Sequence, residues 1–292
     1  MKKYFITYSN ELYSETREFC LKMARKMGRF DEVIRFTPED IDPKFTTENS
    51  VILSVRNGNG LWLWKPYFIH KILCTIENGD VLVYCDAGSF FIKSSKYIID
   101  SMSNEDIWVS DIPLIEKQFT NPSLFRIMNC DSDEYKETNQ IQANFIAVRK
   151  SEVSMRFVKE WLNYCKQPAC IVPEENVSVD GFQFMGHRSD QSILSLLSKK
   201  YGLHPHLDPT QYGRIPEKYY AKYRIFNKSE HNKEYSTLII LHRTKNVDKK
   251  VVLNQWLCSW LPLWLVGLMS KPVNQIRKER NEEAYGCCNK CQ

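Results

Sequence analysis

Apolar and polar positions alternate at the start of the chain and predict a strand at residues 3–8. Apolar residues at helical spacing then predict a helix at 14–27, which Gly28 ends. A short apolar run predicts a second strand at 33–36. This order of strand, helix and strand indicates the opening of an α/β domain.

The most apolar strand pattern lies at residues 81–85 and leads directly into Asp86, Ala87 and Gly88. In open α/β sheets, ligands bind beyond the carboxyl ends of the strands, so Asp86 lies where a ligand is expected. An Asp at such a place can equally cap the next helix. This stretch alone does not decide between the two roles.

The remaining pattern continues the alternation to about residue 245. We expect helices at 67–76, 92–102, 151–165 and 190–201, and strands at 107–110, 140–148 and 237–241. Residues 111–118 have the composition of a loop. These elements predict one α/β domain over residues 1–250.

A basic, glycine-rich stretch precedes the helix expected at 67–76. Arg56 is followed by two glycines, and Lys65 and Pro66 open the helix. Cations and glycines at a helix start suit a phosphate group. The spacing matches neither the P-loop nor the dinucleotide fingerprint, so an ordinary surface loop is the alternative.

A second polar cluster begins the helix expected at 190–201. Asp190 alone would serve as a helix cap, but His187, Arg188 and Gln191 are more polar residues than a cap requires. If the apolar face of this helix packs into the core, these side chains point at one place. We therefore treat them as candidate ligand-binding residues.

Two further candidates lie at predicted strands. Asn144 stands in the run 140–148, where it could contact a ligand or make a strand-end hydrogen bond. His242 ends the strand at 237–241 and carries a metal-competent imidazole, although a lone histidine there is more often structural. Asp86 is the candidate partner that would make His242 a ligand.

Composition narrows the class of protein. Apolar residues make up 43% of the 292 residues, enough for a substantial core. The 40 Lys and Arg residues against 35 Asp and Glu residues form no dense basic block before residue 240, so nucleic acid is not an expected partner. Scattered single cysteines and the lack of a signal-peptide pattern predict a cytoplasmic protein.

The C-terminal tail, residues 251–292, differs in character. Residues 256–269 are almost entirely apolar and contain three tryptophans, but they are too few to span a bilayer, which needs about 20 residues. Cations follow within residues 271–280. Tryptophan and flanking cations favour a membrane interface, so we expect 256–280 to contact the inner face of the plasma membrane. A last helix packed on the domain, or a dimer contact, is the alternative.

Three ordered motifs, at residues 62–67, 79–88 and 187–192, resemble the GT-A-fold glycosyltransferases of bacterial capsule and O-antigen polysaccharide synthesis. The resemblance covers about residues 3–245. It implies a GT-A, Rossmann-like fold with a mixed, mainly parallel central sheet flanked by helices. It also implies transfer of a sugar from a nucleoside-diphosphate sugar to a saccharide acceptor.

In such enzymes an Asp-x-Asp motif holds Mn²⁺ or Mg²⁺ on the donor diphosphate. Here Gly88 replaces the second carboxylate, so the resemblance implies a metal held by Asp86 and His242, with Arg56 and Lys65 as an alternative source of positive charge. The candidate donor-binding residues are Thr7, Tyr8, Ser9, Arg56, Lys65, Asp86, Ala87, Gly88, Asn144, His187 and Arg188.

The resemblance further assigns catalysis to Asp190 and Gln191, because an Asp-Gln pair lies near the reacting carbon in some retaining galactosyltransferases. An inverting enzyme would need a carboxylate base, for which Asp190, Asp111 and Glu116 qualify. We expect retention and a lipid-linked oligosaccharide acceptor. The alternatives are an inactive homologue that binds nucleotide sugars, and a membrane-peripheral interaction protein.

Overall fold

The computed structural model describes residues 1–179, 181–228, 231 and 235–261. The chain divides into two compact units, Met1–Asp248 and Lys249–Gln292, each described separately below. The cations expected at a membrane within residues 271–280 lie outside the described residues.

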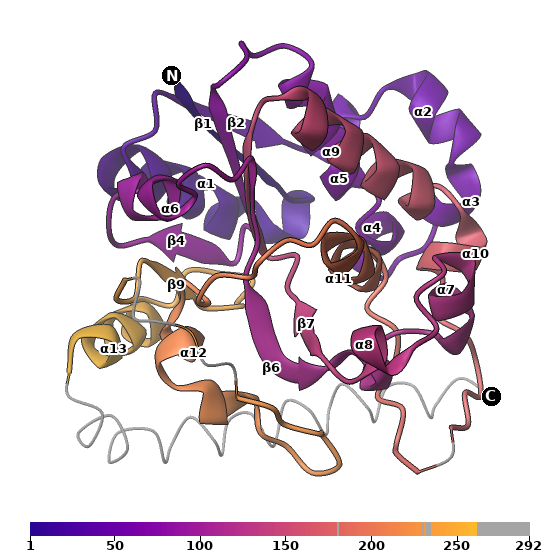
Figure 1. Ribbon diagram of the computed structural model, residues 1–292. Coiled ribbons are helices and arrows are strands. Elements are labelled where there is room, and N and C mark those ends of the chain that lie inside the picture. Colours follow the sequence, from indigo (N-terminus) through magenta and orange to yellow (C-terminus); the bar gives the residue numbers. More distant parts are fainter. Residues whose placement is uncertain (180, 229–230, 232–234, 262–292) are drawn as a thin grey trace. The chain divides into compact units, whose positions relative to one another are not determined.

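A five-stranded sheet forms the centre of the first unit, in the order β2-β1-β3-β8-β5 (Figure 1). Its strands are β1 (Lys3–Tyr8), β2 (Glu32–Phe36), β3 (Val81–Cys85), β5 (Ile107–Trp108) and β8 (Phe145–Arg149). β1 pairs in parallel with β2 and β3, whereas β8 is antiparallel to β3 and β5. Four strands therefore point one way and β8 opposes them, which confirms the mixed, mainly parallel α/β sheet.

Helices surround this sheet. They are α1 (Ser14–Met23), α2 (Pro43–Glu48), α3 (Ser50–Leu53), α4 (Gly58–Leu61), α5 (Trp64–Leu73), α6 (Lys96–Ser101), α7 (Pro122–Ile127), α8 (Asp133–Lys136), α9 (Glu152–Cys165), α10 (Pro168–Ile171), α11 (Asp190–Lys200) and α12 (Gln211–Arg214). A π-helical turn (Ala24–Gly28) extends α1, and 3₁₀ turns lie at η1 (Glu11–Tyr13), η3 (Pro38–Asp40), η4 (Glu116–Gln118) and η5 (Pro216–Tyr219). The helices expected at 14–27, 151–165 and 190–201 are confirmed.

One predicted strand is wrong in its extent. The run 140–148 is broken into β7 (Asn139–Ile141) and β8. The break arises because the backbone N–H groups between them leave the sheet: Gln142 donates to Ser110 O (3.0 Å), and Ala143 donates to the side chain of Gln191 (3.3 Å). The residues between β7 and β8 therefore continue the hydrogen-bond ladder of neither strand.

Two small sheets correct other expectations. Residues 111–118 are not a loop, because β6 (Asp111–Ile115) pairs antiparallel with β7. The strand expected at 237–241 exists as β9 (Ile239–Leu241), but it pairs with β4 (Ser89–Phe91) outside the central sheet. The helix expected at 92–102 is shortened to α6 because the chain before it continues from β4.

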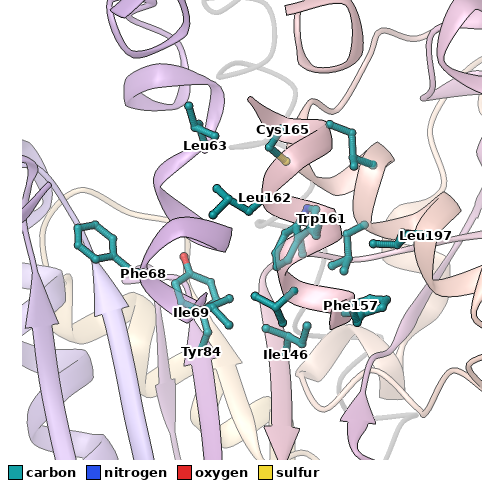
Figure 2. Close-up of a cluster of buried hydrophobic side chains, with 14 of the residues drawn as sticks. Leu63, Phe68, Ile69, Tyr84, Ile146, Phe157, Trp161, Leu162, Cys165 and Leu197 are labelled. Atoms are coloured by element: carbon teal, nitrogen blue, oxygen red, sulfur yellow. The ribbon is translucent and has the colours of Figure 1, made fainter. Parts of the chain in front are cut away.

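Alternation along β3 produces a core on each face of the sheet. Leu82 and Tyr84 pack with α5, α9 and α11, whereas Val81, Val83 and Cys85 pack on the face that α1 and α6 cover. Figure 2 shows the first of these cores, where Trp161 and Leu162 of α9 face Ile69 and Tyr84. The sheet is therefore buried on both faces, so a ligand-binding site is expected at the ends of its strands.

The described part of the second unit is the helix α13 (Lys249–Trp260). Several of its large apolar side chains are exposed, including Leu253, Trp256 and Trp260. Within the residues that the structure describes, no helix has both the length and the apolar character needed to cross a membrane.

The helix α9 offers a direct test of the core. Phe157 is completely buried, whereas Val153 one turn earlier is 44% exposed. Phe157→Ala should lower the free energy of unfolding in urea by about 3–5 kcal/mol, because it leaves a cavity beneath the sheet. Val153→Ala, the matched control, should change it by less than about 0.5 kcal/mol. Equal effects of the two substitutions would contradict this packing.

Candidate active site

Lys65 lies at the centre of the candidate site. Its side chain is 3% exposed, and its ammonium Nζ lies 3.0 Å from Asp190 Oδ2 and 3.5 Å from Asp86 Oδ1. The same Nζ donates a hydrogen bond to Ala143 O (3.0 Å). One buried cation thus joins the two carboxylates that the sequence singles out.

Three elements bring these groups together. Lys65 stands in the first turn of α5, Asp86 follows β3 directly, and Asp190 is the first residue of α11. The backbone carbonyl of Asp190 accepts a hydrogen bond from Trp161 Nε1 (3.1 Å), which ties the start of α11 to α9. The carboxyl end of β3 therefore meets the starts of two helices, as the strand-end rule predicts.

The electrostatics of this cluster depend on burial. Burial raises the pKa of Asp190 to about 6, although the nearby charge of Lys65 opposes the rise. Burial also lowers the pKa of Lys65, but the attraction of Asp190 and Asp86 outweighs it and leaves that pKa above its ordinary value. Near neutral pH Lys65 is therefore ionised, and its charge favours the ionised form of Asp190.

Asp86 is the accessible member of the cluster, with a side chain 29% exposed. Its Oδ1 accepts a hydrogen bond from the hydroxyl of Tyr84, and its backbone N–H donates to Asn144 O (3.0 Å). Its other carboxylate oxygen has no hydrogen-bond partner in the described part of the chain, so it is available to a ligand. The contact of Asn144 with Asp86 is thus made by the backbone carbonyl of Asn144.

His242 reaches the same turn from β9. The backbone N–H groups of His242 and Arg243 both donate to Gly88 O, at 2.9 and 3.2 Å. The imidazole is buried, and burial lowers the pKa of His242 to about 4, so the ring is neutral near pH 7. Its Nε2 is buried and has no hydrogen-bond partner among the described residues.

The other ring nitrogen of His242 is held by Thr244. Nδ1 lies 3.3 Å from the backbone N of Thr244, which can donate to it, and 2.7 Å from Thr244 Oγ1, whose hydroxyl donates to Asn246 O (2.7 Å). These contacts orient the ring and are compatible with either tautomer. The tautomer with its hydrogen on Nδ1 has a lone pair on Nε2, which is the form of imidazole that binds metals.

The side chains of Asp86 and His242 would provide only part of the ligand set of a divalent cation. In the described residues no group of three or more His, Cys, Asp and Glu side chains could enclose a metal ion. Asp86 offers one carboxylate oxygen and His242 one buried imidazole nitrogen, each without a hydrogen-bond partner among the described residues, but no contact there joins the two side chains. A cation held by these two would complete its shell with water and substrate oxygens, as Mg²⁺ commonly does.

Gln191 is held beside the cluster rather than exposed to solvent. Its Oε1 accepts from Ala143 N–H (3.3 Å), and its Nε2 donates to Gln140 Oε1 (2.8 Å). Gln140 lies in β7, and Ala143 lies in the break between β7 and β8. The end of β7 and the break that follows it therefore position Gln191.

The residues expected at the nucleotide base lie at the carboxyl end of β1. Thr7 and Ser9 are buried, and Ser9 accepts from the guanidinium of Arg17 (3.3 Å). Tyr8 stacks on Trp64 with ring centroids 3.8 Å apart, and its hydroxyl accepts from Asn59. Contact of these residues with a donor stays a prediction.

Two other candidates have surroundings unlike those expected. Arg56 is exposed, and its guanidinium makes no ion pair with any described residue. His187 is held inside the protein, where Nδ1 accepts from Asn121 N–H (3.2 Å) and Nε2 donates to Cys170 O (3.0 Å). Burial lowers the pKa of His187 to about 4. Its neutral ring fastens the segment before α11.

The carboxylates considered as bases for inversion already have partners. Glu116 is completely buried and forms an ion pair with Lys199 (2.6 Å). Asp111 lies 2.6 Å from His231 Nε2 and accepts from Asn139 (2.9 Å). Neither carboxylate stands beside Asp190.

The sequence interpretation missed two contributors to the site. Tyr84 precedes Asp86 by two residues, so the alternation of the strand places its hydroxyl on the side of Asp86. That signal was available in the sequence. No signal in the sequence identified Gln140, because its contact with Gln191 depends on how β7 packs against α11.

Removal of Lys65 tests whether the cluster is held by charge. Lys65→Met leaves Asp190 buried without its cation, so the free energy of unfolding at pH 7.5 should fall by about 3–5 kcal/mol. The deficit should shrink towards pH 5, because a folded-state pKa of Asp190 above its unfolded value lets protonation stabilise the folded state. Urea unfolding across this pH range measures both effects.

The control for this experiment is the double variant Lys65→Met/Asp190→Asn, which removes the stranded charge. It should recover much of the lost stability at pH 7.5 and lose the pH dependence. A Lys65→Met protein with unchanged stability at pH 7.5, or a double variant no more stable than the single one, would contradict the buried ion pair.

No protein-family model and no curated protein matches the chain. Among solved structures, it is similar to mouse xyloside xylosyltransferase 1 in its apo form, at TM-score 0.43 and 10% identity over 84% of this chain and 99% of that one. It is also similar to the glycosyltransferase GlyE of Streptococcus pneumoniae TIGR4, at TM-score 0.43 and 11% identity. That match covers 94% of this chain, which spans only 64% of the GlyE structure.

A third similar structure is the galactosyltransferase LgtC in complex with donor and acceptor sugar analogs. Its TM-score is 0.44 at 12% identity, over 82% of this chain and 87% of that one. Backbone similarity at this level says nothing about activity. The function must therefore be argued from the residues of this chain.

Proposed function

We propose that this chain is a GT-A-type glycosyltransferase that moves a sugar from a nucleoside-diphosphate sugar to a saccharide acceptor. The observation that carries the proposal is the pairing of Asp86 and Asp190 through the buried Lys65, with the backbone of His242 bonded to Gly88 in the turn that follows Asp86. One carboxylate is accessible and the other is buried. This difference suits two separate tasks, one at the donor diphosphate and one at the sugar.

On the diphosphate side, Asp86 and His242 Nε2 are proposed to hold Mn²⁺ or Mg²⁺. When bound, such a cation supplies positive charge to the leaving nucleoside diphosphate. Thr244 orients the imidazole, and Tyr84 orients the carboxylate. Gly88, which stands where a second carboxylate is usual in this motif, leaves His242 as the second protein ligand.

On the sugar side, Asp190 is proposed to bind donor hydroxyls or to stabilise positive charge that develops at the anomeric carbon. Gln191 lies beside it, fixed by Gln140 and Ala143. Lys65 keeps Asp190 ionised and in place. We favour retention because Glu116 and Asp111, the other candidate bases, are engaged elsewhere.

The acceptor is proposed to be a lipid-linked saccharide of surface-polysaccharide synthesis, met at the inner face of the plasma membrane. The exposed Leu253, Trp256 and Trp260 of α13, together with Lys249 and Lys250 in its first turn, support contact with a membrane surface. Tryptophan favours the headgroup level, and lysine favours anionic lipid.

A thermal-shift screen of sugar nucleotides with and without Mn²⁺ identifies the donor, because a ligand that binds the folded state raises the unfolding midpoint. Asp190→Asn should then lower kcat for donor hydrolysis or transfer by about 100-fold or more, since it removes charge from the reacting centre. The matched control Asp100→Asn, on the exposed surface of α6, should retain kcat. A protein that binds no sugar nucleotide, or an Asp190→Asn variant of full activity, would contradict the proposal.

Thr244→Val tests the metal without touching a ligand. Loss of the hydroxyl releases Nδ1 of His242, so the Mn²⁺ concentration for half-maximal activity should rise about 10- to 100-fold. Thr46→Val, an exposed threonine on α2, serves as the control of the same shape. Manganese binding can also be followed by its paramagnetic resonance signal in the absence of donor and acceptor. Activity that persists in a chelator would refute the metal site.

A further inference from the structure

Glu116, at the start of η4, is completely buried and receives hydrogen bonds from several donors. Lys199 Nζ donates to its Oε2 (2.6 Å), and so does the hydroxyl of Ser195. Its Oε1 accepts from Thr120 Oγ1 (2.5 Å) and from Gln140 Nε2 (3.2 Å). Because an ion-paired carboxylate only accepts hydrogen bonds, Gln140 must turn its NH₂ group, and not its carbonyl oxygen, towards Glu116.

Gln140 passes this direction on to the proposed catalytic pair. With Nε2 on Glu116, its Oε1 accepts from Gln191 Nε2 (2.8 Å) and from the guanidinium of Arg188 (3.2 Å). The side chain of Gln140 is completely buried, so protein groups take the place of water at both ends of its amide. Gln191 must therefore present its own NH₂ group to Gln140.

The other end of Gln191 is fixed independently. Its Oε1 accepts from the backbone N–H of Ala143 (3.3 Å), which can only donate. We call the sequence from Ala143 N–H through Gln191 and Gln140 to Glu116 the amide chain. It has a donor-only group at one end and an acceptor-only group at the other, and both ends require the same orientation of the two amides. Neither glutamine can exchange its oxygen and nitrogen without breaking hydrogen bonds.

The backbone before Gln191 is also held in an unusual form. Ser189 has φ 46° and ψ −116°, and Gln191 N–H donates to Arg188 O (3.0 Å). This is the geometry of a type II′ turn, in which the residue at this position is normally Gly. Ser189 is buried, and Arg188 N–H donates to Phe119 O (3.1 Å). Such backbone strain persists where surrounding contacts over-determine it, and it is concentrated at functional sites.

We propose that Glu116 and Gln140 are positioning residues that hold the amide of Gln191 in one orientation towards the donor sugar. Neither touches the sugar, because both act through Gln191. The inference rests on the proposed function and deepens it, since Glu116, a candidate base in the sequence, orients the proposed catalytic amide. A fixed amide keeps its remaining N–H and its remaining lone pair in constant places, so it needs little rearrangement as the transition state forms.

Gln140→Met tests this role, because methionine matches the length of glutamine and lacks its hydrogen bonds. With the donor found in the screen, kcat should fall about 10- to 100-fold while KM for the donor changes less than about threefold, since misplacement of Gln191 acts mainly on the transition state. Phe157→Leu is the stability control. It weakens the core of α9 without contacting the amide chain, so it should retain kcat at a temperature where the protein stays folded.

An exchange of the two positioning residues separates orientation from simple loss of a side chain. Gln140→Glu alone places a second carboxylate against Glu116, so it should lower both kcat and the unfolding midpoint. The double variant Glu116→Gln/Gln140→Glu again provides a donor at 116 and an acceptor at 140. Its kcat should return to within about fivefold of wild type. A double variant as inactive as Gln140→Glu would overturn the proposal, and this pair decides the question if Gln140→Met does not fold.

Hydrogen exchange at Ala143 reports on Gln191 without any substrate. The reference is the neighbouring N–H of Gln142, which donates to Ser110 O (3.0 Å) and lies outside the amide chain. In Gln140→Met, exchange at Ala143 relative to Gln142 should accelerate about tenfold, because the released Gln191 no longer protects it. Gln191→Ala should give the same acceleration, and Phe157→Leu should leave the ratio unchanged.

The outcomes separate the two proposals. Full kcat in Gln140→Met, or an unchanged ratio of the exchange rates at Ala143 and Gln142, would overturn the positioning role while the transferase proposal stands. Accelerated exchange at Ala143 in a protein that binds no sugar nucleotide would support the amide chain and refute the transferase. A fall in kcat together with accelerated exchange, both reversed by the exchanged pair, is the result that we expect.

Discussion

The site depends on one buried ammonium group. Lys65 loses its hydration at 3% exposure, and the protein compensates with Asp190, Asp86 and Ala143 O within 3.5 Å. The ring of Tyr84 adds a cation–π contact at 5.3 Å from its centroid. The three charged groups belong to three different elements. A shift of α5, of the end of β3 or of the start of α11 alone would leave a buried charge without its partner.

This constraint assigns different properties to two carboxylates of the same chemical type. Asp190 is buried against the ammonium and has a raised pKa, whereas the Asp86 side chain is 29% exposed and one of its oxygens has no hydrogen-bond partner among the described residues. His242 meets that turn through backbone hydrogen bonds from a strand outside the central sheet. The turn after Asp86 therefore carries a buried, neutral imidazole whose Nε2 has no hydrogen-bond partner among the described residues.

Much of this arrangement could be predicted from the sequence. The apolar run at 81–85 and the strand-end rule located Asp86, and the helical face of α11 located Asp190 at its first turn. The contact of Lys65 with both could not be predicted, because it depends on how α5 packs across the sheet. The break between β7 and β8 also escaped prediction, since its cause is the side chain of Gln191 and not a local Gly or Pro.

A crystal structure of the full chain with Mn²⁺ and an unreactive analogue of the screened sugar nucleotide tests the central claim most directly. The account predicts a metal bound by the Asp86 carboxylate and by His242 Nε2, with the diphosphate on that metal and the donor sugar against Asp190. Lys65 should still lie between the two carboxylates. A nucleotide bound elsewhere, or one bound here with Nε2 of His242 uncoordinated and Asp190 remote from the sugar, would contradict it.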